Sequence, residues 1–195
     1  DDIVACLWII SERLDNSDNL ARLVCSSLVA MNHMRVTNPN KPLEGMPRKQ
    51  FERYSLIVGM IGKHCNLDSH DELFKSKLGP KMTGSSISKL MVDIVVPFAS
   101  PIQPLDVRKA ALDSVGLVCQ SAPRNYVAAN IYTTFQQVFD EQNPVLESMI
   151  LRSFKEFLFT EEKRSEQAPD TAAGDGKGKK KRELTVIGGT NYDDV

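Results

Sequence analysis

Apolar and polar positions along the chain alternate at the spacing of amphipathic α-helices. The clearest stripe predicts a helix over residues 86–99, with apolar side chains at i, i+3, i+4, i+7, i+8 and i+11: Ile87, Leu90, Met91, Ile94, Val95 and Phe98. Pro97 is expected to kink or end this helix, because proline lacks a backbone N–H and clashes one turn back. Residues 101–104, Pro-Ile-Gln-Pro, predict a turn into the next helix.

The segment from Asp106 to Gly116 reads Asp-Val-Arg-x-x-Ala, then Leu, Val and a small residue, which is typical of the second helix of a HEAT-type hairpin. Asp106 is expected near the helix N-terminus, where its carboxylate can accept free backbone N–H groups. Arg108 is expected to reach a carboxylate or carbonyl of an adjacent repeat. Small and branched residues form the predicted packing stripe: Val107, Ala110, Ala111, Ser114, Val115, Val118 and Cys119. The alternative is an ordinary amphipathic helix.

Stripes of the same kind predict helices over about 3–14, 18–36 and 48–65, and two more between residues 125 and 160. In the first of these, the shared apolar face is formed by Val4, Leu7, Trp8 and Leu14. The stripes of the later helices include Leu23, Val127, Phe139 and Leu158, which we expect to face neighbouring helices. Gly59 and Gly62 should permit close packing of the helix that contains them, at some cost in helix propensity.

The second half of the chain repeats the same hairpin pattern with a period of about 40 residues. Asn143-Pro144 predicts a capped helix start and stands 37 residues after Asp106, at the matching place of the next hairpin. Such a period indicates a HEAT or armadillo solenoid. We therefore predict an all-α HEAT-repeat α-solenoid over residues 1–165, built from antiparallel hairpins at about 3–36, 48–80, 86–119 and 125–160.

The composition changes after Glu161, where the apolar period ends. Residues 166–183 are expected to form a flexible loop that is first acidic and then basic, and residues 184–195 to begin another element. The basic run consists of Lys177, Lys179, Lys180, Lys181 and Arg182. It is consistent with salt-sensitive binding to DNA phosphates, with a nuclear localisation signal, or with a solubilising loop.

Composition narrows the possible functions. Hydrophobic residues make up 42% and charged residues 25% of 195 residues, and the formal net charge is -1, so any basic surface must be local. The four cysteines form no Cys-x-x-Cys pair and fall in apolar patterns, which indicates buried thiols in a reducing compartment. No apolar run is long enough for a membrane span. Without an initiator Met or a signal peptide, we expect a segment of a longer protein.

No grouping of residues predicts catalysis. His64 and Cys65 are adjacent, so on a helix they point about 100° apart, which is poor geometry for a nucleophile and its base. No Cys/His set has metal-ligand spacing, and Asp68, Asp71 and Glu72 are expected to be loop charges and helix caps. We therefore expect a protein that is not an enzyme and needs no cofactor or metal. Three cations are candidates for a partner surface: Arg124, Arg152 and Lys155.

Residues 53–68 read Arg-Tyr-Ser-Leu-Ile-Val-Gly-Met-Ile-Gly-Lys-His-Cys-Asn-Leu-Asp. This stretch resembles a phrase of the adherin or Nipped-B family, the large subunits of the cohesin loader. Residues 107–119 and 143–162 look like two successive HEAT repeats of the same proteins. The resemblance runs from about residue 1 to 165 and points to fungal members, whereas the basic insert at 174–182 matches nothing in the family.

The resemblance implies a hook-shaped HEAT scaffold that loads cohesin onto chromosomes and stimulates its ATPase without being an ATPase. It implies nuclear, chromatin-associated action, with double-stranded DNA and the kleisin and ATPase heads of cohesin as partners. The small loader subunit would bind a region outside this chain. No family contact residue is transferred to a numbered position. The alternative is a HEAT scaffold of another complex, such as a transport receptor, condensin subunit or phosphatase scaffold.

Overall fold

The computed structural model describes residue 9 and residues 17–65, 67–78, 82 and 84–167. Every regular element within them is helical, and the longer ones are α2 (Ser17–Thr37), α3 (Gly45–His64), α5 (Ile87–Val95), α6 (Leu105–Ser121), α7 (Ala129–Asp140) and α8 (Pro144–Gln167). Shorter pieces are η1 (Leu67–His70), α4 (Asp71–Lys75), η3 (Val96–Ala99) and η4 (Pro123–Val127). The predicted helix over 3–14, the basic run at 177–182 and the element at 184–195 lie outside the described residues, apart from Ile9.

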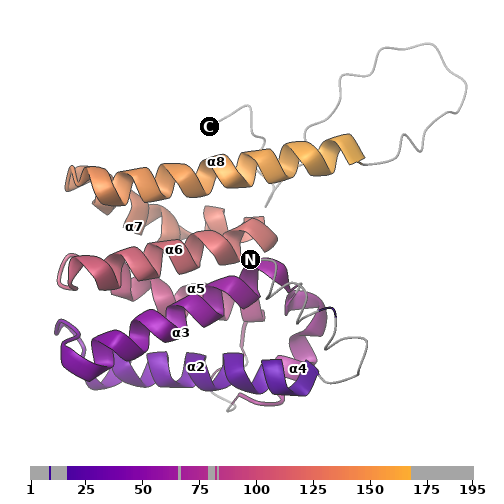
Figure 1. Cartoon of the computed structure of the whole chain (residues 1–195), viewed down its shortest axis with the longest axis horizontal. Coiled ribbons are helices and arrows are strands. Elements are labelled where there is room, and N and C mark those ends of the chain that lie inside the picture. The colour runs from indigo at the N-terminus through magenta and orange to yellow at the C-terminus, as the bar shows by residue number, and fades with distance from the viewer. Residues whose placement is uncertain (1–8, 10–16, 66, 79–81, 83, 168–195) are drawn as a thin grey trace, which may run out of the picture.

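The helices stack as antiparallel hairpins (Figure 1). In this part of the chain, α2, α5 and α7 each pack against the long helix that follows, which gives the hairpins α2–α3, α5–α6 and α7–α8. The second helices α3, α6 and α8 lie side by side in one layer, with α6 in extensive contact with both neighbours. We call this layer the B layer. Repetition of one hairpin with its neighbour is the arrangement of an α-solenoid, as the sequence predicted.

The observed hairpins differ from the predicted grouping of residues 48–80. The helix α3 packs against α2 and α6, whereas α4 packs against α2, η1 and α5. At five residues, α4 is too short to bury the apolar stripe of α3. Residues 38–44 form the turn of the hairpin α2–α3.

The B layer is close-packed because small residues line its seams. A Cβ added to Gly59 would lie 2.9 Å from the Cα of Ser114, and one added to Gly62 would lie 2.6 Å from Val118 Cγ2. Between α6 and α8, a Cβ on Gly116 would lie 2.5 Å from Ser153 Oγ. The predicted role of Gly59 and Gly62 in close helix packing is therefore confirmed.

Most predicted stripe residues are in the core, including all but the half-buried Leu90 in the 86–99 stripe. As predicted, Pro97 ends α5, which stops at Val95 and continues as the 3-10 turn η3. The prediction was wrong for residues that expose a large part of their surface: Leu23 at 43%, Val127 at 56%, Phe139 at 39% and Leu158 at 59%. Val127 lies in the 3-10 segment η4, so its α-helical phase does not apply.

Candidate functional site

Contacts between repeats occupy the edge of the solenoid at which α3, α6 and α8 begin. Arg108 is only 6% exposed, and its Nε donates to the carbonyl of Ala99 at 2.9 Å. Its Nη2 lies 2.7 Å from the carboxylate of Glu141, in the turn before α8. The prediction that Arg108 reaches a carboxylate or carbonyl of an adjacent repeat is confirmed. Its side chain holds two repeats together and is not available to a partner.

The preceding pair of repeats is joined at the same end. Arg48, in the first turn of α3, forms an ion pair with Asp106, in the first turn of α6. The side chain of Gln103 connects the turns themselves, because its Oε1 accepts from the Leu43 N–H at 2.9 Å and its Nε2 donates to the Lys41 carbonyl at 2.9 Å. We call these contacts, together with those of Arg108, the repeat ladder. They fix how one hairpin packs on the next.

Asp106 and Asn143 start their helices in different ways. Asn143 precedes the first residue of α8, and its Oδ1 accepts from the N–H groups of Val145 at 3.1 Å and Leu146 at 3.4 Å, as expected of a cap. Asp106 is the second residue of α6, where its Oδ1 accepts from the Val107 N–H at 3.1 Å. The two residues are therefore not equivalent, and the 37-residue spacing does not match the starts of α6 at Leu105 and α8 at Pro144.

The other residues of the Asp106 signature pack as the stripe predicts. Val107 is fully buried, Val115 is buried, and Ala110 is half-buried against the core. They are structural and offer no functional group to a ligand.

Arg124, in the 3-10 segment η4, makes contacts at the start of α5. It forms an ion pair with Asp68 and donates to Ser86 Oγ at 3.2 Å. Asp68 also accepts from the Ser88 N–H at 3.0 Å, and Asp71 accepts from the Ile87 N–H at 2.9 Å, so both carboxylates cap α5. Arg124 therefore contacts residues at the start of α5, whereas Arg152 and Lys155 lie on α8.

Arg152 and Lys155 belong to an exposed face of the B layer. A shallow cavity of ≈ 260 Å³ opens there between α3, α6 and α8, and its polar lining includes Lys63, Asp113, Arg152 and Glu156. Residues at helical spacing, up to four turns from the cavity lining, extend this face: Lys49 and Glu52 on α3, Lys109 on α6 and Lys155 on α8. We call these eight residues the B face.

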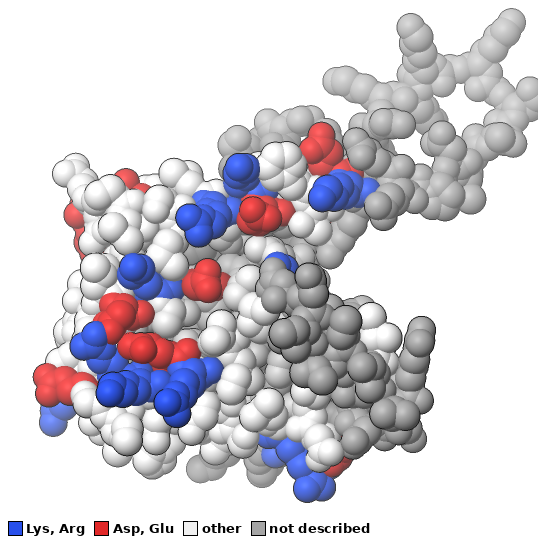
Figure 2. Space-filling view, viewed as in Figure 1, with Lys and Arg blue, Asp and Glu red and all other residues white. Residues whose placement is uncertain are grey.

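Cations and carboxylates alternate across the B layer, over α3, α6 and α8 (Figure 2). Lys49, Lys109, Arg152 and Lys155 are all exposed, and the Nζ of Lys155 lies 5.6 Å from the Phe159 ring centroid. The sequence predicted only Arg152 and Lys155 here. The i, i+4 spacing of Lys109 and Asp113 was visible in the sequence, but it does not say which helices share a surface.

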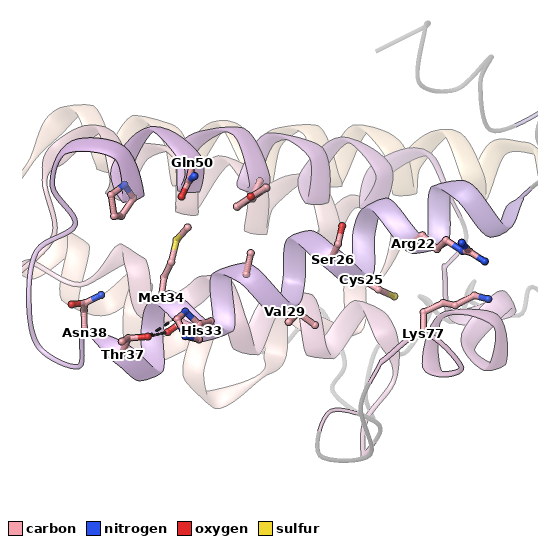
Figure 3. Close-up of a pocket in the computed structure, with 13 residues that line it drawn as sticks. Arg22, Cys25, Ser26, Val29, His33, Met34, Thr37, Asn38, Gln50 and Lys77 are labelled. Atoms are coloured by element: carbon pink, nitrogen blue, oxygen red, sulfur yellow. Dashed lines mark hydrogen bonds between the residues drawn. The ribbon is translucent and has the colours of Figure 1, made fainter.

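A second hollow lies at the first described hairpin and has a volume of ≈ 830 Å³. It follows α2 from Arg22 to Asn38 and is closed on the other side by Pro47, Gln50 and Tyr54 of α3. Met34 and Gln50 point toward each other across it (Figure 3). Its lining is mostly apolar, with no carboxylate.

The buried thiols have no reactive character. Burial raises the pKa of the Cys25 thiol to about 11, and burial also raises the pKa of Cys119. Cys65 is buried as well, so the expectation of buried thiols is confirmed for these three, and Cys6 lies outside the described residues. A protonated, buried thiol is neither a nucleophile nor a metal ligand.

Within the described ranges, no group of three or more His, Cys, Asp or Glu side chains could hold a metal ion. None of the helices in that part of the chain is long and apolar enough to cross a membrane. What the site offers is therefore a set of charged and apolar surfaces.

Comparisons with known proteins identify a relative among solved structures. No protein-family model matches the chain, and no curated protein matches it either. Among solved structures, the chain is similar to a C-terminal fragment of the cohesin loader SCC2 from Chaetomium thermophilum, with 66% sequence identity and a TM-score of 0.77. The match covers 85% of this chain and 12% of that one, so the chain spans a small part of its relative.

Proposed function

Since the chain belongs to the adherin or Nipped-B family, the large HEAT-repeat subunits of the cohesin loader, we propose that it is part of the scaffold that promotes loading of cohesin onto chromosomal DNA. The observation that carries this proposal is the 66% identity, over 85% of the chain, to a fragment of a cohesin loader. The scaffold acts in the nucleus, on chromatin, by presenting binding surfaces rather than by covalent chemistry.

The B face is the surface we assign to this role. The side chains of the repeat ladder are engaged in ion pairs between repeats: Arg48 with Asp106, and Arg108 with Glu141. Lys49, Lys109, Arg152 and Lys155 are exposed and lie on consecutive B-layer helices. Such a row can follow the phosphates of double-stranded DNA, which proteins bind through Lys and Arg without reading sequence. In the same proposal, the scaffold contacts the kleisin and the ATPase heads of cohesin and stimulates the ATPase.

The test is a charge reversal of the B face in the intact loader. Arg152→Glu with Lys155→Glu should weaken DNA binding and slow cohesin loading, because two phosphate-binding cations become repulsive. Both side chains are exposed, so the variant should keep the helical content and thermal stability of the parent. Stimulation of cohesin's ATPase is measured in parallel and should fall with loading.

A matched control changes the same number of charges away from the B face. Lys41 lies in the turn between α2 and α3, and Arg35 lies on α2 near Asp93 of α5. Lys41→Glu with Arg35→Glu should leave DNA binding and loading at the level of the parent. Equal losses in the two double variants would mean a general effect of charge, and unchanged loading in Arg152→Glu, Lys155→Glu would remove the B face from the proposal.

We also propose that the basic run at 177–182 adds salt-sensitive, sequence-independent contacts to DNA. Its five cations carry the local positive charge that the chain as a whole lacks. Replacing Lys179, Lys180 and Lys181 by Ala should lower DNA affinity at low salt. Unaltered affinity would leave the run as an import signal or a spacer.

A further inference from the structure

We propose that the groove between α2 and α3 is the docking site of the chain's own N-terminal segment, residues 3–14. The structure describes Ile9 alone among the first sixteen residues, so the argument comes from the groove, from the sequence of the segment and from the short connection between them. This docking is independent of the DNA-binding role assigned to the B face.

The groove has the chemistry of a helix-packing surface. Its wall is formed by Cys25, Val29, Ala30 and Met34 of α2 and by Pro47 and Tyr54 of α3. Val29 exposes 46% of its surface, although it lies on the same helix as the fully buried Val24, Leu28 and Met31. On the other side of α3, Gly59 and Gly62 are already packed against α6. The groove is therefore the surface of this hairpin that has no neighbouring helix among the described residues.

The segment has the complementary pattern. Val4, Leu7, Trp8 and Leu14 share a face at helical spacing, and only residues 15 and 16 separate the segment from the start of α2. A helix of twelve residues is about 18 Å long, and the groove wall from Arg22 to Asn38 follows α2 for about 24 Å, at 1.5 Å per residue. A connection of two residues makes docking intramolecular, with the high effective concentration of a short tether.

Charge favours the same occupant. Arg22 and Lys77 line one end of the groove, and both pair with the single carboxylate of Asp18. The lining itself contains no carboxylate, so two cations share one neighbouring carboxylate and this end keeps a surplus positive charge. The first sixteen residues carry Asp1, Asp2, Glu12 and Asp15 against a single Arg13. Glu12 and Asp15 lie next to the connection, and therefore near Arg22 once the segment folds back along α2.

The experiment uses the fluorescence of the native chain, because Trp8 is its one tryptophan. If the segment docks, Trp8 emission should lie at shorter wavelength than in the urea-unfolded chain, and iodide should quench it several-fold less. Val29→Asp places a charge in the groove at an exposed position. It should shift the emission toward that of the unfolded chain and restore quenching, with helical content unchanged.

Val145→Asp is the matched control, because Val145 is similarly exposed at 42% but lies at the start of α8. It should leave the Trp8 signal at the parent value. Solvent-exposed Trp8 in the parent would overturn the proposal, and so would a buried Trp8 that Val29→Asp does not change. A signal that varies with protein concentration would assign the groove to a second copy of the chain and would also overturn it.

Discussion

Glycines that pack against side chains decide how closely the B-layer helices approach. At Gly62, the space that a methyl group would need is taken by Val118 Cγ2, 2.6 Å from the added carbon. In a helix, replacing glycine by alanine normally stabilises by about 0.5–1 kcal/mol because the unfolded chain loses freedom. At this seam the steric conflict opposes that gain, since overpacking a core costs about 1–3 kcal/mol.

We therefore expect Gly62→Ala to lower the free energy of unfolding by about 1–2 kcal/mol. Val118→Ala, made in the same background, should recover part of that loss because it removes the opposing methyl groups. Urea denaturation of the parent, the two single variants and the double variant gives the coupling energy. A strictly additive double variant would show that the two side chains do not compete for the same space.

Arg108 offers a second prediction at the scale of single residues. Arg108→Met should lower the free energy of unfolding by about 2–3 kcal/mol, because it leaves the Ala99 carbonyl without its side-chain donor and Glu141 without its cation. Glu141→Gln should cost about 1 kcal/mol or less, since the amide oxygen still accepts and this side chain is 25% exposed. Equal losses in the denaturation midpoints of the two variants would contradict this ranking.

Part of this detail could be predicted from the sequence. Arg108 follows Asp106 in a repeat signature, which predicts a contact with the adjacent repeat. Its partner Glu141 and the pair between Arg48 and Asp106 could not be predicted, because they depend on which turns meet at one end of the stack. The B face was missed for the same reason, since Lys49, Lys109 and Arg152 come from three helices far apart in sequence.

At the scale of elements, periodicity predicts helices better than it predicts their partners. The helix α5 and its end before Pro97 followed from the sequence alone, because the stripe and the proline act locally. The pairing of α3 with α2 did not follow, since the prolines at 39 and 42 read as a break between hairpins rather than as a turn within one. With a break assumed before α3, residues 67–78 were the nearest segment that could pair with it, which led to the predicted hairpin at 48–80.

The segment around α4 is joined to α2 by a charge pair that depends on pH. Asp18 accepts from Lys77, which lowers the pKa of Asp18 below its ordinary value of 3.8, with a further contribution from Arg22. A carboxyl with a lowered pKa in the folded state stabilises the fold above its unfolded pKa, and the contribution is lost as the pH falls through the folded pKa.

Asp18→Asn should therefore be less stable than the parent at neutral pH. The difference should begin to shrink near pH 3.8 and disappear once the pH falls below the lowered pKa of Asp18 in the folded chain. Thermal denaturation across this pH range measures the effect, which should be small because both side chains are partly exposed. Lys77→Met removes the largest cause of the shift, so in that background Asp18→Asn should have less effect. A difference that persists at the lowest pH would mean that the substitution acts through packing of the introduced amide instead.

At the scale of the whole molecule, the stacking of hairpins leaves surface regions with different roles. The repeat ladder closes the end where α3, α6 and α8 begin, and Asp68, Asp71 and Arg124 close the start of α5. The outer side of α8 exposes Leu151 at 58% and Leu158 at 59%, and the groove exposes Val29 at the opposite end of the stack. Apolar side chains are thus exposed at both ends of the stack, where solenoids add repeats, and the B face exposes charged side chains.

This division makes the salt dependence of DNA binding a test of the B face as a unit. Each cation that neutralises a phosphate contributes close to one counterion to the slope of log affinity against log salt concentration. In the intact loader, Lys109→Ala and Arg152→Ala should each weaken binding similarly on all DNA sequences and reduce the slope by about 1. Lys41→Ala, in the turn between α2 and α3, should leave the slope unchanged. Because Asp113 and Glu156 line the same cavity as Arg152, Asp113→Asn should strengthen binding, and a slope that is the same in all these variants would mean that DNA follows another surface.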